Sequence, residues 1–314
     1  MTTAAAARLM SWSAAFSRPV AWGPTGMLDG ALAGLSARLD AGELDAGFAI
    51  KNLSFSRRPS PAQADDWRML VVVVVARPVH TVTFQRAGAR VEAFLPPTYL
   101  SYRSSFETMR QELVTGPLAG ARVQTLDGPL KAIASSLGLV RYGRNNVAYA
   151  DAFGSWVQLY GCVTDADLPL DPGWQPQPPA LLDECDVCGV CEAACPTGAI
   201  SGERVLLHAE RCLTLANESA GGWPAWVPPG AHHCLVGCLS CQRTCPANPP
   251  LPVENSGVDF DEAETASLLA GGEPGTPAFD GALAKLQRLG LSFDAEVIGR
   301  NLRALLLARE LQTI

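Results

Sequence analysis

Apolar and polar positions in the first half of the chain follow the spacings of both strands and helices. Residues 70–76 form a continuous run of apolar, mostly β-branched side chains, which predicts a strand buried on both faces. Residues 79–84 and 89–94 alternate around Arg86-Ala87-Gly88, as expected of a β-hairpin. Helical spacing at 28–40, 103–114 and 129–137, with one more strand at 156–163, completes a pattern that predicts a mixed α/β sandwich with one sheet.

Prolines then interrupt the chain twice. Segment 169–179 contains five prolines and can form neither a helix nor a central strand, and a second break lies at 246–252. Residues 259–270 and 278–312 return to helical spacing, with apolar stripes made by Leu283, Leu286, Leu289, Ile298, Leu302, Leu305 and Leu306. We therefore predict an α+β protein with a mixed α/β domain at 1–172, a small module at 173–252 and a C-terminal helical cap at 253–314.

Eight of the ten cysteines lie between these breaks, in an order that indicates a ferredoxin-like pair of iron-sulfur clusters. The runs are Cys185-x2-Cys188-x2-Cys191-x3-Cys195-Pro196 and Cys238-x2-Cys241-x3-Cys245-Pro246, with Cys212 alone between them. In such modules three thiolates of one run bind one 4Fe-4S cluster, and the cysteine before proline binds the other. The first cluster is thus assigned Cys185, Cys188, Cys191 and Cys245, and the second Cys195, Cys212, Cys238 and Cys241. The module is predicted to move single electrons.

Other interpretations of the cysteines remain open. Zinc also binds C-x2-C pairs, but it needs four ligands in two pairs, without the interlocked prolines. A disulfide framework is not needed by a 314-residue chain with 48% hydrophobic residues. Cys234 could replace Cys212 as a ligand, whereas Cys162 lies in an apolar segment and is expected to be a buried core thiol.

Length and composition predict a cytoplasmic protein of two or three domains. The longest apolar run, 69–76, is far shorter than the ~20 residues of a membrane helix, so no membrane partner is expected. The amino terminus has no apolar h-region and no twin-arginine pair. Reduced thiols and iron-sulfur ligation also favour the cytoplasm.

Charge is distributed unevenly along the chain. Residues 1–150 hold 16 Lys and Arg against 10 Asp and Glu, whereas residues 151–314 hold 8 against 21. The acidic half could be a docking face for a redox partner, or could serve solubility alone. The basic half is expected to face an anionic cofactor or substrate. Its excess is small and dispersed, which argues against a polyanion such as tRNA as the substrate.

Several segments around the cysteines resemble one protein family. They are Pro129-Leu130-Lys131 through Gly138-Leu139, Tyr142-Gly143-Arg144-Asn145-Asn146, Gly154-Ser155-Trp156, Arg211-Cys212-Leu213, Gly237-Cys238-Leu239-Ser240-Cys241-Gln242 and Cys245-Pro246-Ala247-Asn248. Over about residues 96–250 the chain is similar to the epoxyqueuosine reductases, which join a cobalamin-binding domain to a double 4Fe-4S domain and are related to reductive dehalogenases. The Tyr-Gly-Arg-Asn-Asn form resembles a divergent branch of that family.

The resemblance implies a cobalamin site. Its expected contacts are Gly138, Tyr142, Gly143, Arg144, Asn145, Asn146 and Ser155, with Gly138 and Gly143 letting the backbone approach a planar ring. The cobalt would lack a histidine ligand, because His80, His208, His232 and His233 lie in no Asp-x-His-x-x-Gly segment. The alternative for the arginine and asparagines is loop structure, with Asn145 or Asn146 at positive φ.

The chain departs from the family where a general acid is expected. Gln124 stands where the family has an aspartate, and Asp127 follows three residues later. We predict Asp127 as the catalytic proton donor and Tyr99 as the second candidate. The alternative for Asp127 is a turn residue, because Asp-Gly-Pro is typical of a turn before a helix.

Two function classes remain. The first is a cobalamin-dependent reductase that acts on a small or nucleotide-like substrate and receives electrons from a low-potential donor such as a ferredoxin or flavodoxin. The second is a cofactor-free, two-cluster electron-transfer protein that serves a partner enzyme. About 180 residues precede the cysteine module, which is more than an electron carrier needs and favours the reductase.

Overall fold

The computed structural model describes residues 3–53, 67–204, 206–291 and 293–312. Two compact units contain these residues. The first unit comprises Met1–Ala76 and Ser104–Cys188, and the second comprises Arg77–Arg103 and Gly189–Ile314. The three-domain division expected from the sequence stays a prediction.

In the described part of the first unit, four strands form an antiparallel sheet in the order β1-β2-β8-β5. They are β1 (Val20–Pro24), β2 (Met69–Ala76), β8 (Val157–Thr164) and β5 (Val123–Thr125). The predicted strands at 70–76 and 156–163 are β2 and β8, and they pair with each other along their full length. The hairpin of β6 (Arg141–Tyr142) and β7 (Ala148–Tyr149) follows α6 (Leu130–Ser136).

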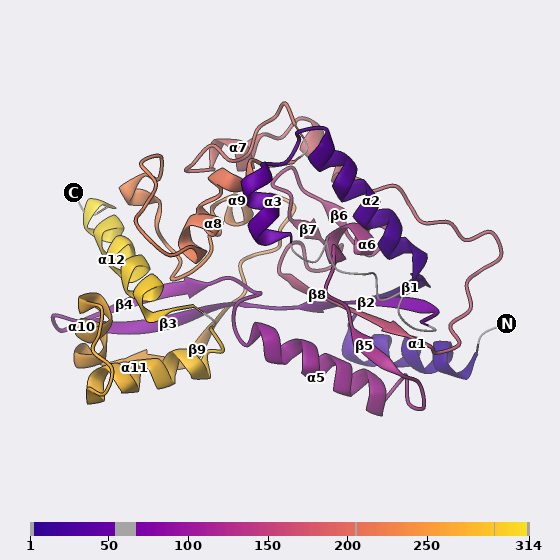
Figure 1. Cartoon of the computed structure of the whole chain (residues 1–314), viewed down its shortest axis with the longest axis horizontal. Helices are drawn as coiled ribbons and strands as arrows, with labels where there is room; N and C mark the ends of the chain where they lie inside the picture. The colour runs from indigo at the N-terminus through magenta and orange to yellow at the C-terminus, as the bar shows by residue number, and fades with distance from the viewer. Residues whose placement is uncertain (1–2, 54–66, 205, 292, 313–314) are drawn as a thin grey trace. The chain divides into compact units, whose positions relative to one another are not determined.

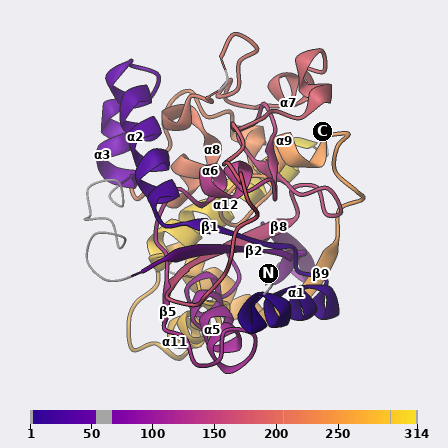
Figure 2. The ribbon, with the colours of Figure 1, turned by 90° about the vertical axis from the view of Figure 1, so that its right-hand side faces the viewer.

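Helices cover both faces of this sheet. Figure 2 shows α1 (Ala4–Phe16) and α5 (Tyr102–Thr115) on one side, and α2 (Gly26–Asp40) and α6 on the other; α3 (Ala46–Asn52) follows α2 in the chain. Because side chains alternate along a strand, Val71 and Val73 pack toward one core, and Leu70, Val72 and Val74 toward the other. A strand covered on both faces needs an unbroken apolar run, and the sandwich prediction is confirmed.

The second unit is built on a separate sheet. Among its described residues, three strands lie in the order β4-β3-β9: β3 (Val79–Arg86) and β4 (Ala89–Leu95) form the predicted hairpin, and β9 (Val253–Phe260) runs parallel to β3. The rings of Phe84 and Phe260 stack with centroids 4.7 Å apart. The predicted C-terminal helices are α10 (Glu262–Ala270), α11 (Pro277–Arg288) and α12 (Ala295–Gln312), and they complete this core (Figure 1).

The expectation of one sheet is therefore wrong. The hairpin pairs with β9 rather than with the central sheet of the first unit. The sequence of β9 does not have the alternation of apolar and polar residues that predicts a strand. Residues 253–255 are exposed, and only Val258 and Phe260 are buried in this strand. Helices α1 and α3 and strand β1 were also not predicted.

Among its described residues, the cysteine module contains short helical elements. They are η2 (Asp183–Asp186) in the first unit, and α7 (Val190–Ala193), η3 (Ala209–Arg211), α8 (Leu213–Glu218), η4 (Pro229–Ala231) and α9 (Ser240–Arg243) in the second. The segment before Cys238 is fixed to the edge of β4: the Phe94 amide donates to the His233 carbonyl (3.4 Å), and the Leu235 amide donates to the Phe94 carbonyl (2.9 Å). The sheet thus supports the module's second cysteine run.

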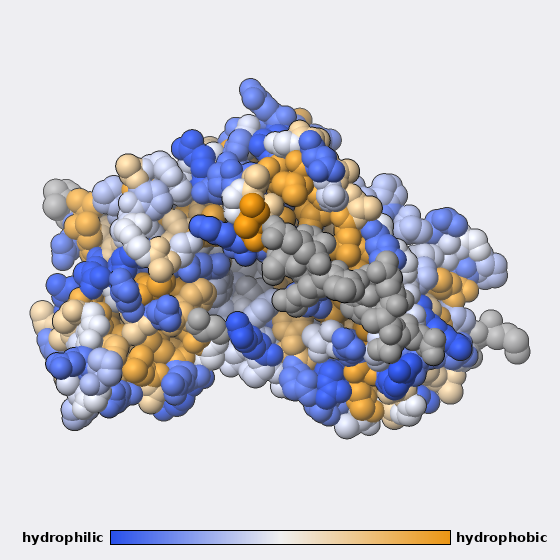
Figure 3. Space-filling model, in the orientation of Figure 1, coloured by the Kyte–Doolittle hydropathy of each residue, from blue (hydrophilic) through white to orange (hydrophobic). Residues whose placement is uncertain are grey.

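Within the described residues, every helix is too short or too polar to span a bilayer. On the face drawn in Figure 3, hydrophilic and hydrophobic residues are interspersed.

A glycine in β8 provides a test of the first unit's packing. A Cβ atom at Gly161 would lie 2.3 Å from Leu130 Cδ2 and 3.4 Å from Leu126 Cβ, so α6 can approach the sheet only over a glycine. We expect Gly161→Ala to lower the free energy of unfolding by about 1–3 kcal/mol through overpacking. Gly34→Ala is the matched control, because Gly34 lies in α2 with open space around it, and alanine there should raise stability by about 0.5–1 kcal/mol. Anaerobic denaturant unfolding measures both; equal effects would contradict the packing.

Candidate iron-sulfur and cofactor sites

The four cysteines assigned to the second cluster all lie in the second unit. Cys195 follows α7, Cys212 is the N-cap residue of α8, Cys238 precedes α9 and Cys241 lies within it. Burial raises the pKa of the Cys241 thiol well above its usual range, and the charges of Cys238, Cys212 and Cys195 raise it further. Burial and the charge of Cys195 likewise raise the pKa of Cys212. Bound iron would favour the thiolate forms of these cysteines, because a coordinating thiol is deprotonated by the metal's charge.

Hydrogen bonds to sulfur support the same set. The Ala199 amide donates to Cys195 Sγ at 3.3 Å, and Thr197 Oγ1 lies 3.7 Å from that sulfur. Burial would raise the pKa of Cys195, but hydrogen bonds from Thr197, Ala199 and Ile200 outweigh it and lower the pKa. Cys238 Sγ lies 3.5 Å from Ser240 Oγ. A backbone amide already directed at the sulfur of Cys195 fits a thiolate ligand of a 4Fe-4S cluster.

The cysteines assigned to the first cluster belong to both units. Cys185 and Cys188 end the first unit, whereas Cys191 lies in α7 and Cys245 follows α9 in the second. Cys191 is near enough to Cys241 for its charge to raise the pKa of that thiol. The division of the ligands between the two clusters stays a prediction.

The two remaining cysteines are both buried. Cys162 lies in β8 at 4% exposure, and burial raises its pKa to about 12, so the prediction of a core thiol is confirmed. Cys234 is 1% exposed and forms an isolated bridge with Phe94 at the edge of β4. Burial raises the pKa of Cys234 well above its usual range, and the charge of Cys238 adds to the rise. Cys234 is therefore close to the second-cluster ligands, and the choice between it and Cys212 needs a direct test.

The Tyr-Gly-Arg-Asn-Asn segment forms a tight turn between β6 and β7. The Gly143 amide donates to the Val147 carbonyl (2.9 Å), and Asn146 adopts the positive φ of 59° expected for one asparagine. Asn145 is 2% exposed, and its Nδ2 donates to the Tyr149 hydroxyl (2.8 Å). Lys131 Nζ donates to the carbonyl and to Oδ1 of Asn146, at 2.7 and 2.8 Å.

This turn holds the start of the cysteine module. The Arg144 guanidinium donates from Nε and Nη2 to the Cys185 carbonyl, at 3.2 and 2.9 Å. The Tyr142 amide donates to the Ala180 carbonyl, and the Leu182 amide donates to the Tyr142 carbonyl, both at 2.8 Å. The structure therefore gives Arg144 an anchoring contact with the backbone of a cluster ligand.

Gly138 and Gly143, which were expected to let the backbone approach the planar ring of cobalamin, have local structural roles. A Cβ at Gly143 would lie 2.5 Å from both Asn145 Oδ1 and Tyr149 Cε2, so the turn itself fills that space. Gly138 has a φ of 74° and follows the C-terminal end of α6, where its amide donates to the Ser135 carbonyl (2.9 Å). Ser155 is buried at 3% exposure. As cobalamin contacts, these residues stay a prediction.

Residues 124–127, where the sequence comparison expects an acidic residue, lie at the edge of the first unit's sheet. Gln124 and Thr125 belong to β5 and line a shallow groove of about 570 Å³ with Trp67, Arg110 and Arg122. Asp127 is exposed and lies in the turn between β5 and α6. Its role as proton donor stays a prediction, and the turn position fits the alternative equally well.

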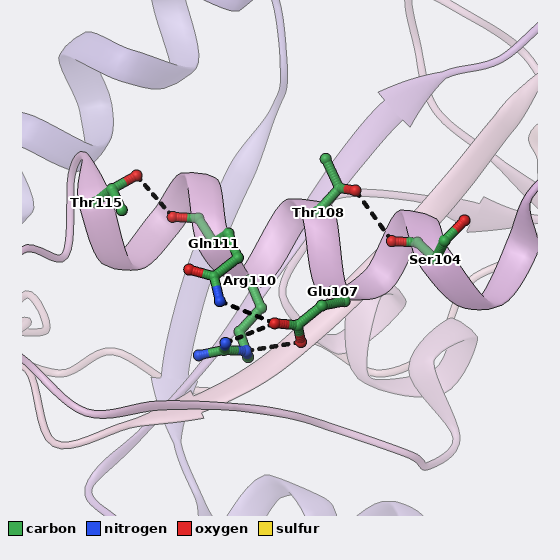
Figure 4. Close-up of polar contacts among 6 residues, drawn as sticks. All are labelled: Ser104, Glu107, Thr108, Arg110, Gln111 and Thr115. Carbon is green, nitrogen blue, oxygen red and sulfur yellow. Dashed lines mark hydrogen bonds and ion pairs between the residues drawn. The ribbon is translucent and has the colours of Figure 1, made fainter.

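Carboxylates pair with many cations of the basic half. Glu107 accepts two hydrogen bonds from Arg110 (2.6 and 2.9 Å) and one from Gln111 (2.9 Å), as Figure 4 shows on the surface of α5. Arg122 pairs with Asp165 at 2.7 Å and stacks on Trp67. Further pairs join Arg18 to Glu112, Arg38 to Glu43 and Arg141 to Asp183. Local pairing therefore offsets much of the positive charge expected to face an anion.

Tyr99 belongs to the second unit and lies beside the second cluster's ligands. Its hydroxyl donates to Glu218 Oε1, and its pKa is raised well above the usual value by burial, with the charges of Glu218, Cys234 and Cys212 adding to the rise. Burial also raises the pKa of Glu218, against the opposing effect of the Tyr99 hydrogen bond. Glu218 was not among the predicted site residues. The signal available in the sequence was its position in the helix that follows Cys212.

Comparison with known proteins agrees with this arrangement. Residues 184–248 match the protein-family model of the 4Fe-4S double cluster binding domain. Epoxyqueuosine reductases of Staphylococcus aureus and Synechococcus sp. (strain RCC307) are 28% and 36% identical over 128 and 121 residues. The alignments cover 41% and 38% of this chain and 32% and 34% of those proteins, so the chain spans about a third of the length of these relatives.

Solved structures extend the likeness to most of the chain. Epoxyqueuosine reductase from Streptococcus thermophilus aligns over 96% of this chain and 80% of its own, with a TM-score of 0.66 and 17% identity. An epoxyqueuosine reductase solved with a tRNA-Tyr epoxyqueuosine-modified stem loop aligns over 95% and 80%, with a TM-score of 0.64 and 20% identity. The chain is similar to the epoxyqueuosine reductases in part of its sequence and shares their fold. The resemblance and the fold class predicted from the residues are thereby confirmed, and residues 184–248 match a double 4Fe-4S cluster binding domain.

Single cysteine replacements test the cluster assignment. We expect Cys245→Ala to lose the first cluster and Cys212→Ala to lose the second, because each removes one thiolate from only one set of four. Cys162→Ala, at a buried position in β8, is the control that should keep both clusters. Anaerobic iron analysis and electron paramagnetic resonance (EPR) spectra of the reduced protein distinguish these results. Loss of the opposite cluster in either variant, or loss of the second cluster in Cys234→Ala but not Cys212→Ala, would refute the assignment.

The ion pair on α5 gives a pH test. Hydrogen bonds from Arg110 and then Gln111 lower the pKa of Glu107 to about 2. A depressed carboxyl pKa stabilises the fold above the ordinary glutamate value and loses that contribution as pH falls toward about 2. Carboxyl NMR should show Glu107 ionised down to the acidic limit of folding, and Arg110→Gln should return its titration toward the ordinary range. Identical titration curves in the two proteins would contradict the pairing.

Proposed function

We propose that this relative of the epoxyqueuosine reductases is an iron-sulfur oxidoreductase that passes single electrons through two 4Fe-4S clusters to cobalamin and then to a substrate. A low-potential ferredoxin or flavodoxin would supply the electrons. The observation that carries the proposal is the double-cluster match of residues 184–248, in which the Ala199 amide already donates to the sulfur of Cys195. Bound cobalamin would supply a strongly reducing cobalt centre, which a neighbouring low-potential cluster can feed.

The residues of this chain have separate tasks in the proposal. Arg144 fixes the backbone of Cys185, so the turn at 142–147 and the first cluster's leading ligand are held as one piece. Gly138, Tyr142, Asn145, Asn146 and Ser155 would present backbone and polar edges to cobalamin from the same part of the first unit. Cobalamin would bind without a histidine ligand.

Two groups could supply the proton that accompanies reduction. Tyr99 has a pKa raised well above its usual value by burial, so its hydroxyl keeps its proton at neutral pH. Asp127 is an exposed carboxylate after β5, in the region where the family carries its acidic residue. Tyr99→Phe and Asp127→Asn test the two candidates. The variant that lowers kcat while leaving the cluster spectra unchanged identifies the proton donor.

A small or nucleotide-like substrate fits the charge distribution. Many arginines of the first unit already pair with carboxylates, so fewer positive charges face phosphates. The related enzyme solved with a modified tRNA stem loop makes epoxyqueuosine in tRNA the first substrate to assay.

Binding of cobalamin is the decisive test. Anaerobically reconstituted protein is titrated with cob(II)alamin, and the EPR spectrum should change to that of the base-off form. Free cob(II)alamin without protein is the control.

The outcomes separate the two function classes. Base-off binding, followed by conversion of an epoxyqueuosine-modified stem loop detected by mass spectrometry, supports the full proposal. Binding without conversion overturns epoxyqueuosine in tRNA as the substrate. The reductase proposal is overturned if the protein does not bind cobalamin and its clusters are still reduced and reoxidised by a ferredoxin. That result would favour the electron-transfer protein.

A further inference from the structure

Helix α12 supplies two adjacent polar residues to the module that holds the second cluster. Asn301 is fully buried, and its Nδ2 donates to the carbonyls of Asn217 and Leu235, each at 2.9 Å. Asn217 lies in α8, which begins after Cys212, and Leu235 lies three residues before Cys238. One side chain therefore joins the two chain segments that bring the isolated cysteine and the second cysteine run together.

A second buried amide strengthens this connection. Asn217 is 1% exposed, and its side chain donates to the Gly237 carbonyl, next to Cys238. Gly237 has a φ of 72°, and a Cβ there would lie 2.8 Å from the Tyr99 ring and 3.0 Å from Pro96. The backbone just before Cys238 is thus fixed from two sides.

Arg300 holds the other end of α8. Its guanidinium donates to the carbonyls of Ala216 (2.9 Å), Asn217 (3.3 Å), Ser219 (2.7 Å) and Gly221 (2.6 Å). It also lies 4.1 Å from the centroid of the Trp223 ring. The last carbonyls of a helix have no partner within the helix, and one planar guanidinium satisfies several of them here.

We propose that Arg300 and Asn301 are positioning residues for the second 4Fe-4S cluster. They contact none of its cysteines, yet they hold the backbone that places Cys212 and Cys238 for ligation. Such a polar network fixes one arrangement, because breaking the links of Asn301 leaves the buried carbonyls of Asn217 and Leu235 without these donors. The functional module then extends beyond residues 184–248 to include α12. This inference rests only on the double-cluster part of the proposed function.

Two variants test the inference. Asn301→Asp keeps the size of the side chain but turns a donor toward two carbonyls into an acceptor. After anaerobic reconstitution we expect its iron content to fall from about eight to about four atoms per chain, with the EPR spectrum of one isolated cluster. Arg300→Gln should keep both clusters but shift the midpoint potential of the second in a redox titration, and Arg300→Lys should restore part of that shift.

Arg303→Gln is the matched control. Arg303 lies on the same helix and also donates to a carbonyl, but its acceptor is Leu269 of α10, outside the cluster module. This variant should keep wild-type iron content, EPR spectra and midpoint potentials, even if its melting temperature falls.

The inference is overturned if Asn301→Asp and Arg300→Gln both fold with full iron, unchanged spectra and unchanged potentials. If Asn301→Asp does not fold, the potential of the partly exposed Arg300→Gln decides alone. Iron content and potentials do not depend on cobalamin or on substrate. Failure of the proposed function therefore leaves these readouts intact.

Discussion

The need to bring several cysteine thiols close together is the constraint on which the second unit depends. Burial raises the pKa of Cys212, Cys238 and Cys241, and the charges of neighbouring cysteines raise it further. The chain can hold such groups together only if its backbone is fixed by other contacts. The elements that carry the cysteines are too short to do this by themselves, since α7 and α9 have one turn each.

Buried polar contacts provide that support. The edge of β4 binds the segment before Cys238 through backbone hydrogen bonds, and α12 reaches the same segment through Asn301. Each contact satisfies a carbonyl or amide that burial would otherwise leave without a partner. Strand β4 and helix α12 therefore belong with the cluster module, although both lie outside it in the sequence.

The Tyr-Gly-Arg-Asn-Asn turn has a structural role in the first unit. Arg144 donates to the Cys185 carbonyl, and Asn145 and Asn146 complete the turn's own hydrogen bonds. Such contacts fix the turn before any ligand arrives, and a preorganised surface loses less entropy on binding. The arrangement is compatible with the proposed cobalamin site, because a turn can present its backbone while its side chains are occupied.

The sequence by itself determined the features that depend on local spacing: strands β2 and β8, the hairpin at 79–94, the C-terminal helices and the eight cysteines with their interlocked order. It could not assign the hairpin to a second sheet, because β9 buries only Val258 and Phe260 and has little alternation. It also could not find Glu218, Arg300 or Asn301, whose partners lie far away in the chain and leave no periodic pattern. Only the tertiary structure decided these contacts, because a hydrogen bond to a distant carbonyl depends on the path of the backbone and not on the residue that accepts it.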